Sequence, residues 1–276
     1  AKANGQFVQQ LQTFLENLNA HLFKNEPISI ADVEFTGEYL LRRFIQYAKE
    51  PVLTRLELMA DDVIQVLKSK RNGEGKFPSK NEIIKRLKKR LTYTTPFDVY
   101  EAFIHELGDE LFHFNKKHFE FNDVYPYLYV KIFFEGIKTY ELVQHFVLDE
   151  MQDYSIFQYA VIDRVFGCKK TILGDRYQVL FYDPEETVVD VLTRIFAKKN
   201  GQGGYELKEL FASYRSTAEI TEFCNGILGG EGIGGNTVER HGRVPEEVQC
   251  GSLEEAVEFI NDKLSYGDMD AYDNIA

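Results

Sequence analysis

The sequence predicts an α/β protein whose first part is helical and whose second part contains a parallel sheet. Apolar residues recur at helical spacing in the first 120 residues, as in Phe7, Leu11, Leu15 and Leu18. From about residue 122, short runs rich in β-formers alternate with helical stretches. Such alternation is typical of parallel strands joined by crossover helices. The 276 residues, of which 44% are hydrophobic, suffice for a sizeable core.

Composition and charge narrow the classes of protein. The net charge of −12 disfavours a free-standing nucleic-acid-binding domain, which usually has a basic surface. It permits an ATPase that acts on a protein, or a motor whose basic track lies elsewhere. No apolar run reaches the roughly 18–20 residues of a membrane span, and the first ten residues are not a secretory signal. We therefore expect no membrane partner. Because the three cysteines are far apart and suggest neither a disulfide framework nor a zinc site, we expect a cytoplasmic protein.

Start and stop signals divide the helical part into elements. Thr36 is a candidate N-cap, Pro51 separates two helices, and Ser79 with Glu82 forms a capping box. We expect a loop from Arg71 to Pro78, where glycine and charge are frequent. The expected elements are a helix over 6–24, a small hairpin over 28–35, a helix through 40–45, a helix carrying 53–67 and a helix opened by Ser79.

The helix after Ser79 is strongly basic. Its expected buried stripe consists of Ile83, Ile84, Leu87 and Leu91. Five basic residues occupy the rest of its surface: Lys85, Arg86, Lys88, Lys89 and Arg90. One interpretation is a patch that binds nucleic acid or an acidic partner. The other is a solvated helix face without a partner, which is common on an acidic chain.

The second part is expected to alternate strands with helices and then to pass through a linker. The expected strands are 144–148, 170–173 and 205–210, and the expected helices are 154–166, 186–197 and 216–228. The glycine-dense stretch 229–236 reads as a linker. Beyond it we expect strands over 237–240 and 246–250, a helix over 253–264 and the start of a strand over 274–276.

The strongest local signal for chemistry is an apolar strand that ends in two adjacent carboxylates. It reads Val147-Leu148-Asp149-Glu150-Met151-Gln152-Asp153. In phosphoryl-transfer sites the first carboxylate holds Mg²⁺, and the second positions or deprotonates the attacking water. The carboxyl end of a parallel strand is where such sheets bind ligands. Taken alone, the pair fits a simple strand-end turn equally well.

Two further motifs follow in order along the chain. The next expected strand is followed by Gly174-Asp-Arg-Tyr-Gln178, and a later segment reads Ser213-Tyr-Arg-Ser-Thr217, with Glu219 close behind. The series DExQD, GDxxQ and SYRST, with its spacing and strand-end placement, resembles motifs II, III and IV of the UvrD/Rep-type superfamily 1 helicases. The resemblance implies part of a RecA-like (P-loop NTPase) parallel sheet with a helical insertion domain. It also implies ATP and Mg²⁺ as cofactors.

The resemblance implies roles for the matching residues. Asp149 would ligate Mg²⁺, Glu150 would be the catalytic base, and Gln178 would sense the γ-phosphate. Tyr214 would stack on adenine, and Arg215 would be an arginine finger. The nucleotide site and its connections to neighbouring motifs would also include Gln152, Asp153 and Asp175. A guanidinium binds phosphoryl oxygens bidentately and stabilises developing charge. An arginine near the positive end of a helix dipole also suggests a nearby anion. The alternative for Arg215 is an ordinary surface arginine.

Further stretches narrow the resemblance to one branch of the family. Asp153-Tyr-Ser155 with Phe157 and Gln158, and Arg240-His-Gly242 with Pro245, look like the HelD-type helicase-like factors that bind bacterial RNA polymerase. The helical first third is loosely similar to the segment that this type inserts before motif II. The resemblance is tight from about 122 to 245. The implied partners are nucleic acid, DNA in the first place, and RNA polymerase.

The sequence departs from the family pattern in two respects. It contains no GxxxxGK[ST], so it lacks the backbone cradle and the lysine that hold the β- and γ-phosphates. Asp183 stands where DNA-translocating members carry a base-stacking tryptophan, and the chain has no tryptophan at all. Stacking is worth about 1–3 kcal/mol per base, so its loss argues against a processive DNA motor.

We therefore expect a piece of a longer ATP-dependent helicase-like motor, itself inactive as an ATPase. The expected divisions are a helical insertion region over 1–121, part of a first RecA-like domain over 122–228, and a linker with the start of a second such domain over 229–276. One alternative is a non-catalytic, helicase-derived binding module. Another is a Mg²⁺-dependent nuclease that uses Asp149, Glu150 and Asp175, which leaves SYRST unexplained.

Overall fold

The computed structural model describes residues 5–70, 77–108, 120–137, 142–176, 178, 187–196, 204–210, 214–227 and 240–266. These residues are mostly helical and include two two-stranded sheets. The chain divides into two compact units, Ala1–Tyr205 and Glu206–Ala276. The expected divisions at 121 and 228 stay predictions. Along the described chain, no helix is both long and apolar enough to cross a lipid bilayer.

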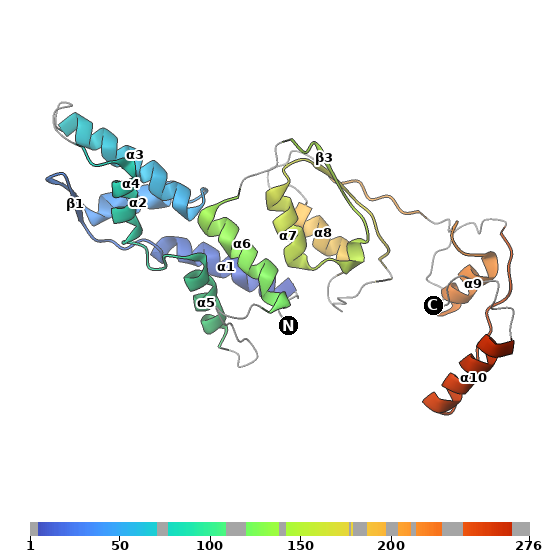
Figure 1. Cartoon of the computed structure of the whole chain (residues 1–276). Helices are drawn as coiled ribbons and strands as arrows, with labels where there is room; N and C mark the ends of the chain where they lie inside the picture. Colours follow the sequence, from blue (N-terminus) through green and yellow to red (C-terminus); the bar gives the residue numbers. More distant parts are fainter. Residues whose placement is uncertain are drawn as a thin grey trace. The chain divides into compact units, whose positions relative to one another are not determined.

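The elements expected over residues 6–67 and after Ser79 are present in the first unit, but the helix after Ser79 ends before Leu91, and α5 was not among the expected elements (Figure 1). Thr36 caps a helix, its hydroxyl accepting the Tyr39 N–H at 3.3 Å, and Ser79 with Glu82 forms the expected capping box. A second capping box, which the sequence analysis missed, joins Thr95 and Asp98. The elements are α1 (Gly5–His21), β1 (Ile28–Ile30), β2 (Val33–Phe35), α2 (Gly37–Gln46), α3 (Val52–Lys70), α4 (Lys80–Lys88) and α5 (Pro96–Leu107).

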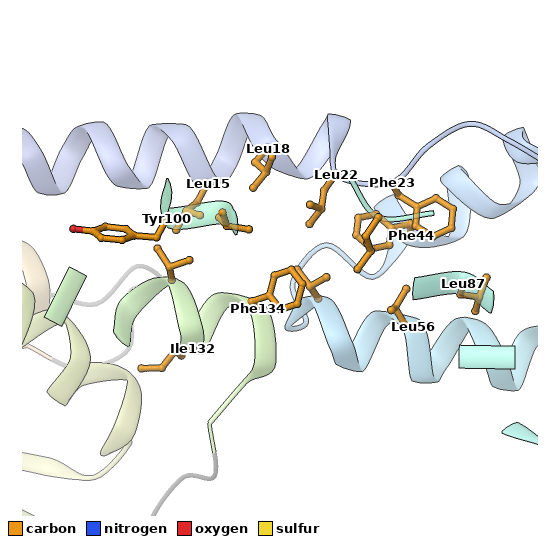
Figure 2. Close-up of a cluster of buried hydrophobic side chains, with 14 of the residues drawn as sticks. Leu15, Leu18, Leu22, Phe23, Phe44, Leu56, Leu87, Tyr100, Ile132 and Phe134 are labelled. Atoms are coloured by element: carbon orange, nitrogen blue, oxygen red, sulfur yellow. The ribbon is translucent and has the colours of Figure 1, made fainter. Parts of the chain in front are cut away.

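A single apolar core holds this part together and extends beyond residue 121. It contains side chains from every element from α1 to α6 (Phe121–Glu135), and it also includes Phe157. Figure 2 shows Leu18 of α1 and Leu22, just after this helix, facing side chains of α3 and α6, among them Phe134. Phe7 packs edge-on against both Phe103 and Phe157, with ring centroids 5.3 and 5.8 Å apart. The core therefore connects the first helix to residues 150 positions later.

A buried arginine ties the turn between α2 and α3 to the rest of the core. Arg55 is 1% exposed, and its guanidinium donates to Asn19 Oδ1, to the Ala48 carbonyl and to the Glu50 carbonyl at 2.7–2.8 Å. It also lies over the Phe44 ring at 5.0 Å. Burial lowers the pKa of Arg55 to about 10. Nothing in the sequence distinguished this arginine from those on the surface.

A parallel strand pair with a crossover helix follows the helical part, as predicted. β3 (His145–Leu148) pairs with β4 (Lys169–Ile172), with Leu148 opposite Ile172, and α7 (Ile156–Val165) connects them. α8 (Val188–Phe196) packs against α7. On α7, Phe157 and Val161 enter the large core, whereas Tyr159 packs with Leu148 and Val191 in a smaller core. This helix therefore attaches the strand pair to the helical part.

The parallel sheet is smaller than the sequence predicted. The expected strand over 205–210 is irregular, with Leu207 58% and Leu210 89% exposed, and the expected strand over 246–250 is irregular too. An alternating sequence becomes a strand only where another strand supplies hydrogen bonds, and no described strand lies beside either segment. Among the described residues, the parallel sheet thus has two strands and does not form an extended RecA-like sheet. Most of 237–240, and all of 274–276, lie outside the described residues.

The second unit contains two helices and an irregular connecting segment in its described part. α9 (Ala218–Ile227) and α10 (Leu253–Tyr266) confirm the helices expected over 216–228 and 253–264. Residues 240–250 run between them without regular structure. The Ala218 N–H donates to the Arg240 carbonyl at 2.9 Å, so this segment contacts the beginning of α9.

Candidate functional site

The two motifs that follow β3 and β4 are hydrogen-bonded to each other through the backbone. The Leu173 N–H donates to the Leu148 carbonyl at 2.8 Å, which extends the parallel pairing by one step. The Met151 N–H then donates to the Leu173 carbonyl at 2.9 Å. The DExQD and GDxxQ motifs therefore leave the sheet side by side at its carboxyl edge. This is the arrangement that places ligand-binding side chains together in parallel sheets.

A chain of side-chain hydrogen bonds connects the expected site residues. Gln152, which is 4% exposed, donates from Nε2 to Glu150 Oε2 at 2.6 Å and accepts the Asp175 N–H on Oε1 at 3.0 Å. Gln178 donates from Nε2 to Asp175 Oδ2 at 3.0 Å. Asp149 accepts the Glu150 N–H on Oδ1 at 2.9 Å. All five residues thus belong to one connected cluster in which the amide of Gln152 bridges the two motifs.

Backbone geometry at the cluster requires particular residues. Glu150 is in the left-handed region at φ 52°, ψ 52°, which a side chain other than glycine rarely adopts. Such conformations cost about 1–3 kcal/mol and concentrate at functional sites. Gly174 lies so close to the other motif that a Cβ there would be 2.5 Å from Gln152 Oε1 and 2.6 Å from the Met151 nitrogen. The glycine of GDxxQ is therefore required by close approach.

Two side chains behind the cluster fix the turn that presents it. The Tyr159 hydroxyl donates to the Met151 carbonyl, and burial raises the pKa of Tyr159 above its ordinary value. Ser155 and Gln158 form a capping box at the start of α7, with the Ser155 N–H 2.7 Å from Gln158 Oε1. These positions explain part of the stretch from Asp153 to Gln158 as local structure. The backbone N–H of Asp153 donates to the Glu150 carbonyl, which closes the turn.

The donor set of the cluster fits a magnesium ion. Asp149 and Glu150 are exposed and adjacent, and carboxylate oxygens are the ligands that Mg²⁺ prefers, usually one or two together with water and phosphate. In the described part of the chain, no three His, Cys, Asp or Glu side chains gather as a dedicated metal site. Among the described residues the arrangement is therefore not a protein cage, whereas a magnesium ion shared with phosphate and water needs as little as one carboxylate, which Asp149 can supply.

The remaining predicted residues belong to the second unit. Tyr214 is 76% exposed and Arg215 is also exposed, just before α9. The Arg215 carbonyl accepts from the Arg240 guanidinium at 3.3 Å. Glu219 accepts from the Gly242 N–H at 2.9 Å, and its Oε1 lies 2.9 Å from His241 Nδ1. The SYRST segment and the Arg240-His-Gly242 segment are separate in the sequence, and these hydrogen bonds connect the beginning of α9 to the second of them.

Electrostatics and close packing reinforce that contact. The pKa of Glu219 is lowered to about 2. The hydrogen bond with His241 is the largest cause, and backbone hydrogen bonds, including that from the Gly242 N–H, contribute less. A Cβ at Gly242 would be 2.7 Å from the Thr217 methyl group, so a glycine is needed there. Sequence reasoning missed this pairing and the close approach of Gly174. Gly174 and Gly242 were the sequence features that could have indicated these close approaches.

The chain has no match among protein-family models or among curated proteins. The interpretation of the site therefore depends on its geometry and on the motifs themselves.

Proposed function

We propose that this chain is part of an ATP-dependent, helicase-like motor of the UvrD/Rep type, closest to the HelD-type factors. The observation that supports this most directly is the hydrogen-bonded bridge from Glu150 through Gln152 to Asp175. Two motifs separated by more than twenty residues meet at adjacent strand ends, in the order expected of an ATP site. In this proposal the two strands are part of a RecA-like sheet, and the motor remodels nucleic acid or a complex such as RNA polymerase.

The proposed roles follow from the positions of the side chains. Asp149 would hold Mg²⁺, which would neutralise charge on the phosphates. Glu150 would position or deprotonate the attacking water, with its carboxylate held in direction by the Gln152 amide. Gln178, hydrogen-bonded to Asp175 of the same motif, would sense the γ-phosphate. Tyr214 and Arg215 of the second unit would contribute the adenine stack and the arginine finger.

The gene sequence upstream of Ala1 gives the first test of the proposal. A GxxxxGK[ST] there supports the motor. The second test is steady-state ATPase activity of this chain joined to that segment, compared with the chain alone. We expect Mg²⁺-dependent hydrolysis only in the longer protein, because the phosphate cradle and its lysine are otherwise missing.

Matched variants make the ATPase test specific to the site. In the longer protein, Glu150→Gln is expected to abolish turnover, whereas Glu135→Gln at the end of α6 removes an exposed carboxylate that belongs to neither motif and leaves turnover intact. Nucleotide binding should survive Glu150→Gln, since a base acts on the chemical step. If Glu150→Gln retains full turnover, the site assignment is wrong. If the longer protein binds partners but hydrolyses nothing, the chain is a helicase-derived binding module.

A further inference from the structure

We propose that the outer face of α4 is a contact surface for the phosphate backbone of a nucleic acid. The surface consists of Lys85 and Lys88 on α4 and Lys89 directly after it. The proposal does not rest on the ATP site, because these residues belong to a different part of the first unit.

The three lysines of α4 share one face of the helix. Lys88 and Lys89 are three and four residues after Lys85, which is the spacing of neighbours on a helix surface. Ile83 and Leu87, on the opposite side, are fully buried against the large core. Lys85 and Lys89 are exposed and Lys88 is half-buried. The lysine surface therefore faces away from the core.

This concentration of charge is not neutralised within the described structure. No hydrogen bond or ion pair of the three ammonium groups is found among the described residues. Like charges at this spacing destabilise a helix by about 0.2–0.5 kcal/mol per pair. The helix dipole favours cations in the last turn but does not require three on one face. The single acid of α4, Glu82, points back to the helix start, where it accepts the Ser79 N–H at 2.8 Å.

The two arginines of this segment are engaged within the fold, which leaves its exposed lysines available to bind an anion. Arg86 and Arg90 donate to the Ser29 and Pro27 carbonyls at 3.0 Å, and Arg90 also pairs with Glu26. Both arginines thus hold the β1–β2 hairpin, which leaves only lysines on the outer face. Lysine binds phosphate as a point charge, and a nucleic-acid backbone presents its phosphates as a continuous row of negative charge. A row of lysines fits the regular charge of a nucleic-acid backbone.

The acidity of the whole chain confines such binding to this surface. With a net charge of −12, most of the protein repels a polyanion. A nucleic acid is therefore expected to bind where positive charge is concentrated, and removing that charge should abolish binding. The same acidity explains why composition alone disfavoured a nucleic-acid-binding domain, since a local surface of three lysines hardly changes the total.

The test is a titration of the chain into a fluorescein-labelled, single-stranded oligodeoxythymidine, read by anisotropy at several salt concentrations. Each phosphate contact on a single strand contributes about 0.7 to the salt dependence, so three lysines contribute roughly 2. Between about 50 and 200 mM salt, these contacts should account for roughly a 15- to 20-fold loss of affinity. The triple variant Lys85→Gln/Lys88→Gln/Lys89→Gln should bind more weakly and lose that part of the salt dependence.

Control variants separate the lysine surface from charge in general. Lys49→Gln/Lys68→Gln/Lys70→Gln makes the same charge change at three other exposed lysines of the first unit, and it should bind like the unaltered chain. Lys85→Arg/Lys88→Arg/Lys89→Arg should keep the affinity, since the charge remains. Glu150→Gln should also keep it, which separates this proposal from the ATP site. A melting curve for each variant confirms that it is folded.

Three results would overturn the proposal. The first is an unaltered chain that does not bind the oligonucleotide at about 50 mM salt. The second is equal binding by the α4 variant and the Lys49, Lys68 and Lys70 control. The third is equally strong competition by poly-glutamate of matched charge, which would make the lysine surface a site for acidic polypeptides.

Discussion

The helical part and the small parallel sheet of the first unit differ in what surrounds their apolar residues. Phe44, Leu56 and Leu87 of the helical part are fully buried, whereas Val147 of β3 is 61% exposed and Leu173, just after β4, is 46% exposed. Hydrophobic stabilisation grows with the apolar area removed from water. The stability of the unit therefore resides mainly in the helical part. The strand ends with the site residues are attached to this stable part through α7.

The largest expected effect tests where this stability resides. Phe44→Ala removes a ring that stacks on Phe23, with centroids 5.1 Å apart, and that also lies under the Arg55 guanidinium. We expect a loss of about 3–5 kcal/mol in the free energy of unfolding, because the cavity cannot fully collapse. Val147→Ala on the exposed strand face should change it by less than about 0.5 kcal/mol. Urea unfolding followed by circular dichroism measures both.

A reversed order would contradict the comparison. If Val147→Ala costs as much as Phe44→Ala, the exposed face of β3 is covered in solution, and the sheet is more complete than its described neighbours indicate. A second strand variant, Thr171→Val, then locates the covering contact, because Thr171 lies opposite Val147 on the same exposed face.

A smaller effect is expected at the strand ends themselves. Gly174→Ala places a Cβ against the Met151 nitrogen and the Gln152 amide, and crowding of this kind costs about 1–3 kcal/mol. Gly167→Ala is the matched control, since a Cβ there meets nothing within 4 Å. Hydrogen exchange should show faster opening of the Asp175 N–H in Gly174→Ala only. Equal exchange in the two variants would mean that the two motifs are not held together as described.

The sequence predicted the helical part better than the sheet, for physical reasons. Caps at Thr36 and Ser79 and the apolar spacing of α1 are local signals, and they gave the helix starts closely. The strands expected over 205–210 and 246–250 had the local pattern but no described neighbour with which to pair. Strand formation depends on a partner that one segment cannot specify.

The site was predictable as a set of residues but not as an arrangement. DExQD and GDxxQ identified Asp149, Glu150 and Gln178 as candidates, and the structure joins them in one hydrogen-bonded cluster, while their roles stay predictions. The bridging role of Gln152 depends on its burial and on the Asp175 N–H, which no spacing encodes. The left-handed backbone of Glu150 could not be predicted either, because in a sequence it is mainly glycine that indicates this conformation.

The smallest expected effect concerns the second unit, which extends the comparison to a region held by polar contacts. Among its described residues only Thr221 is buried, so the contact between α9 and residues 240–242 depends on hydrogen bonds. The pKa of Glu219 is lowered to about 2 from an ordinary value of 4.5. A carboxyl group whose folded pKa is depressed stabilises the fold above the ordinary pKa. That contribution is lost as the pH falls from about 4.5 through about 2.

A titration of the Glu219 carboxyl carbon by NMR measures this directly, and the Gly242 N–H provides a second probe. We expect protection of Gly242 from hydrogen exchange to persist at pH 5 and to weaken as the carboxylate is protonated, because protonation removes the charge that accepts the bond. Glu219→Gln should weaken it already at neutral pH, whereas Glu222→Gln, at an exposed position on the same helix, should not. These changes should leave urea unfolding of the first unit unaltered, since both of its apolar cores lie within residues 7–196. Two results would show that the SYRST segment is not anchored to Arg240-His-Gly242. One is a Glu219 carboxyl that titrates near 4.5, and the other is hydrogen-exchange protection of Gly242 that stays the same in Glu219→Gln. The exposed position of Arg215 would then have to be set by some other contact.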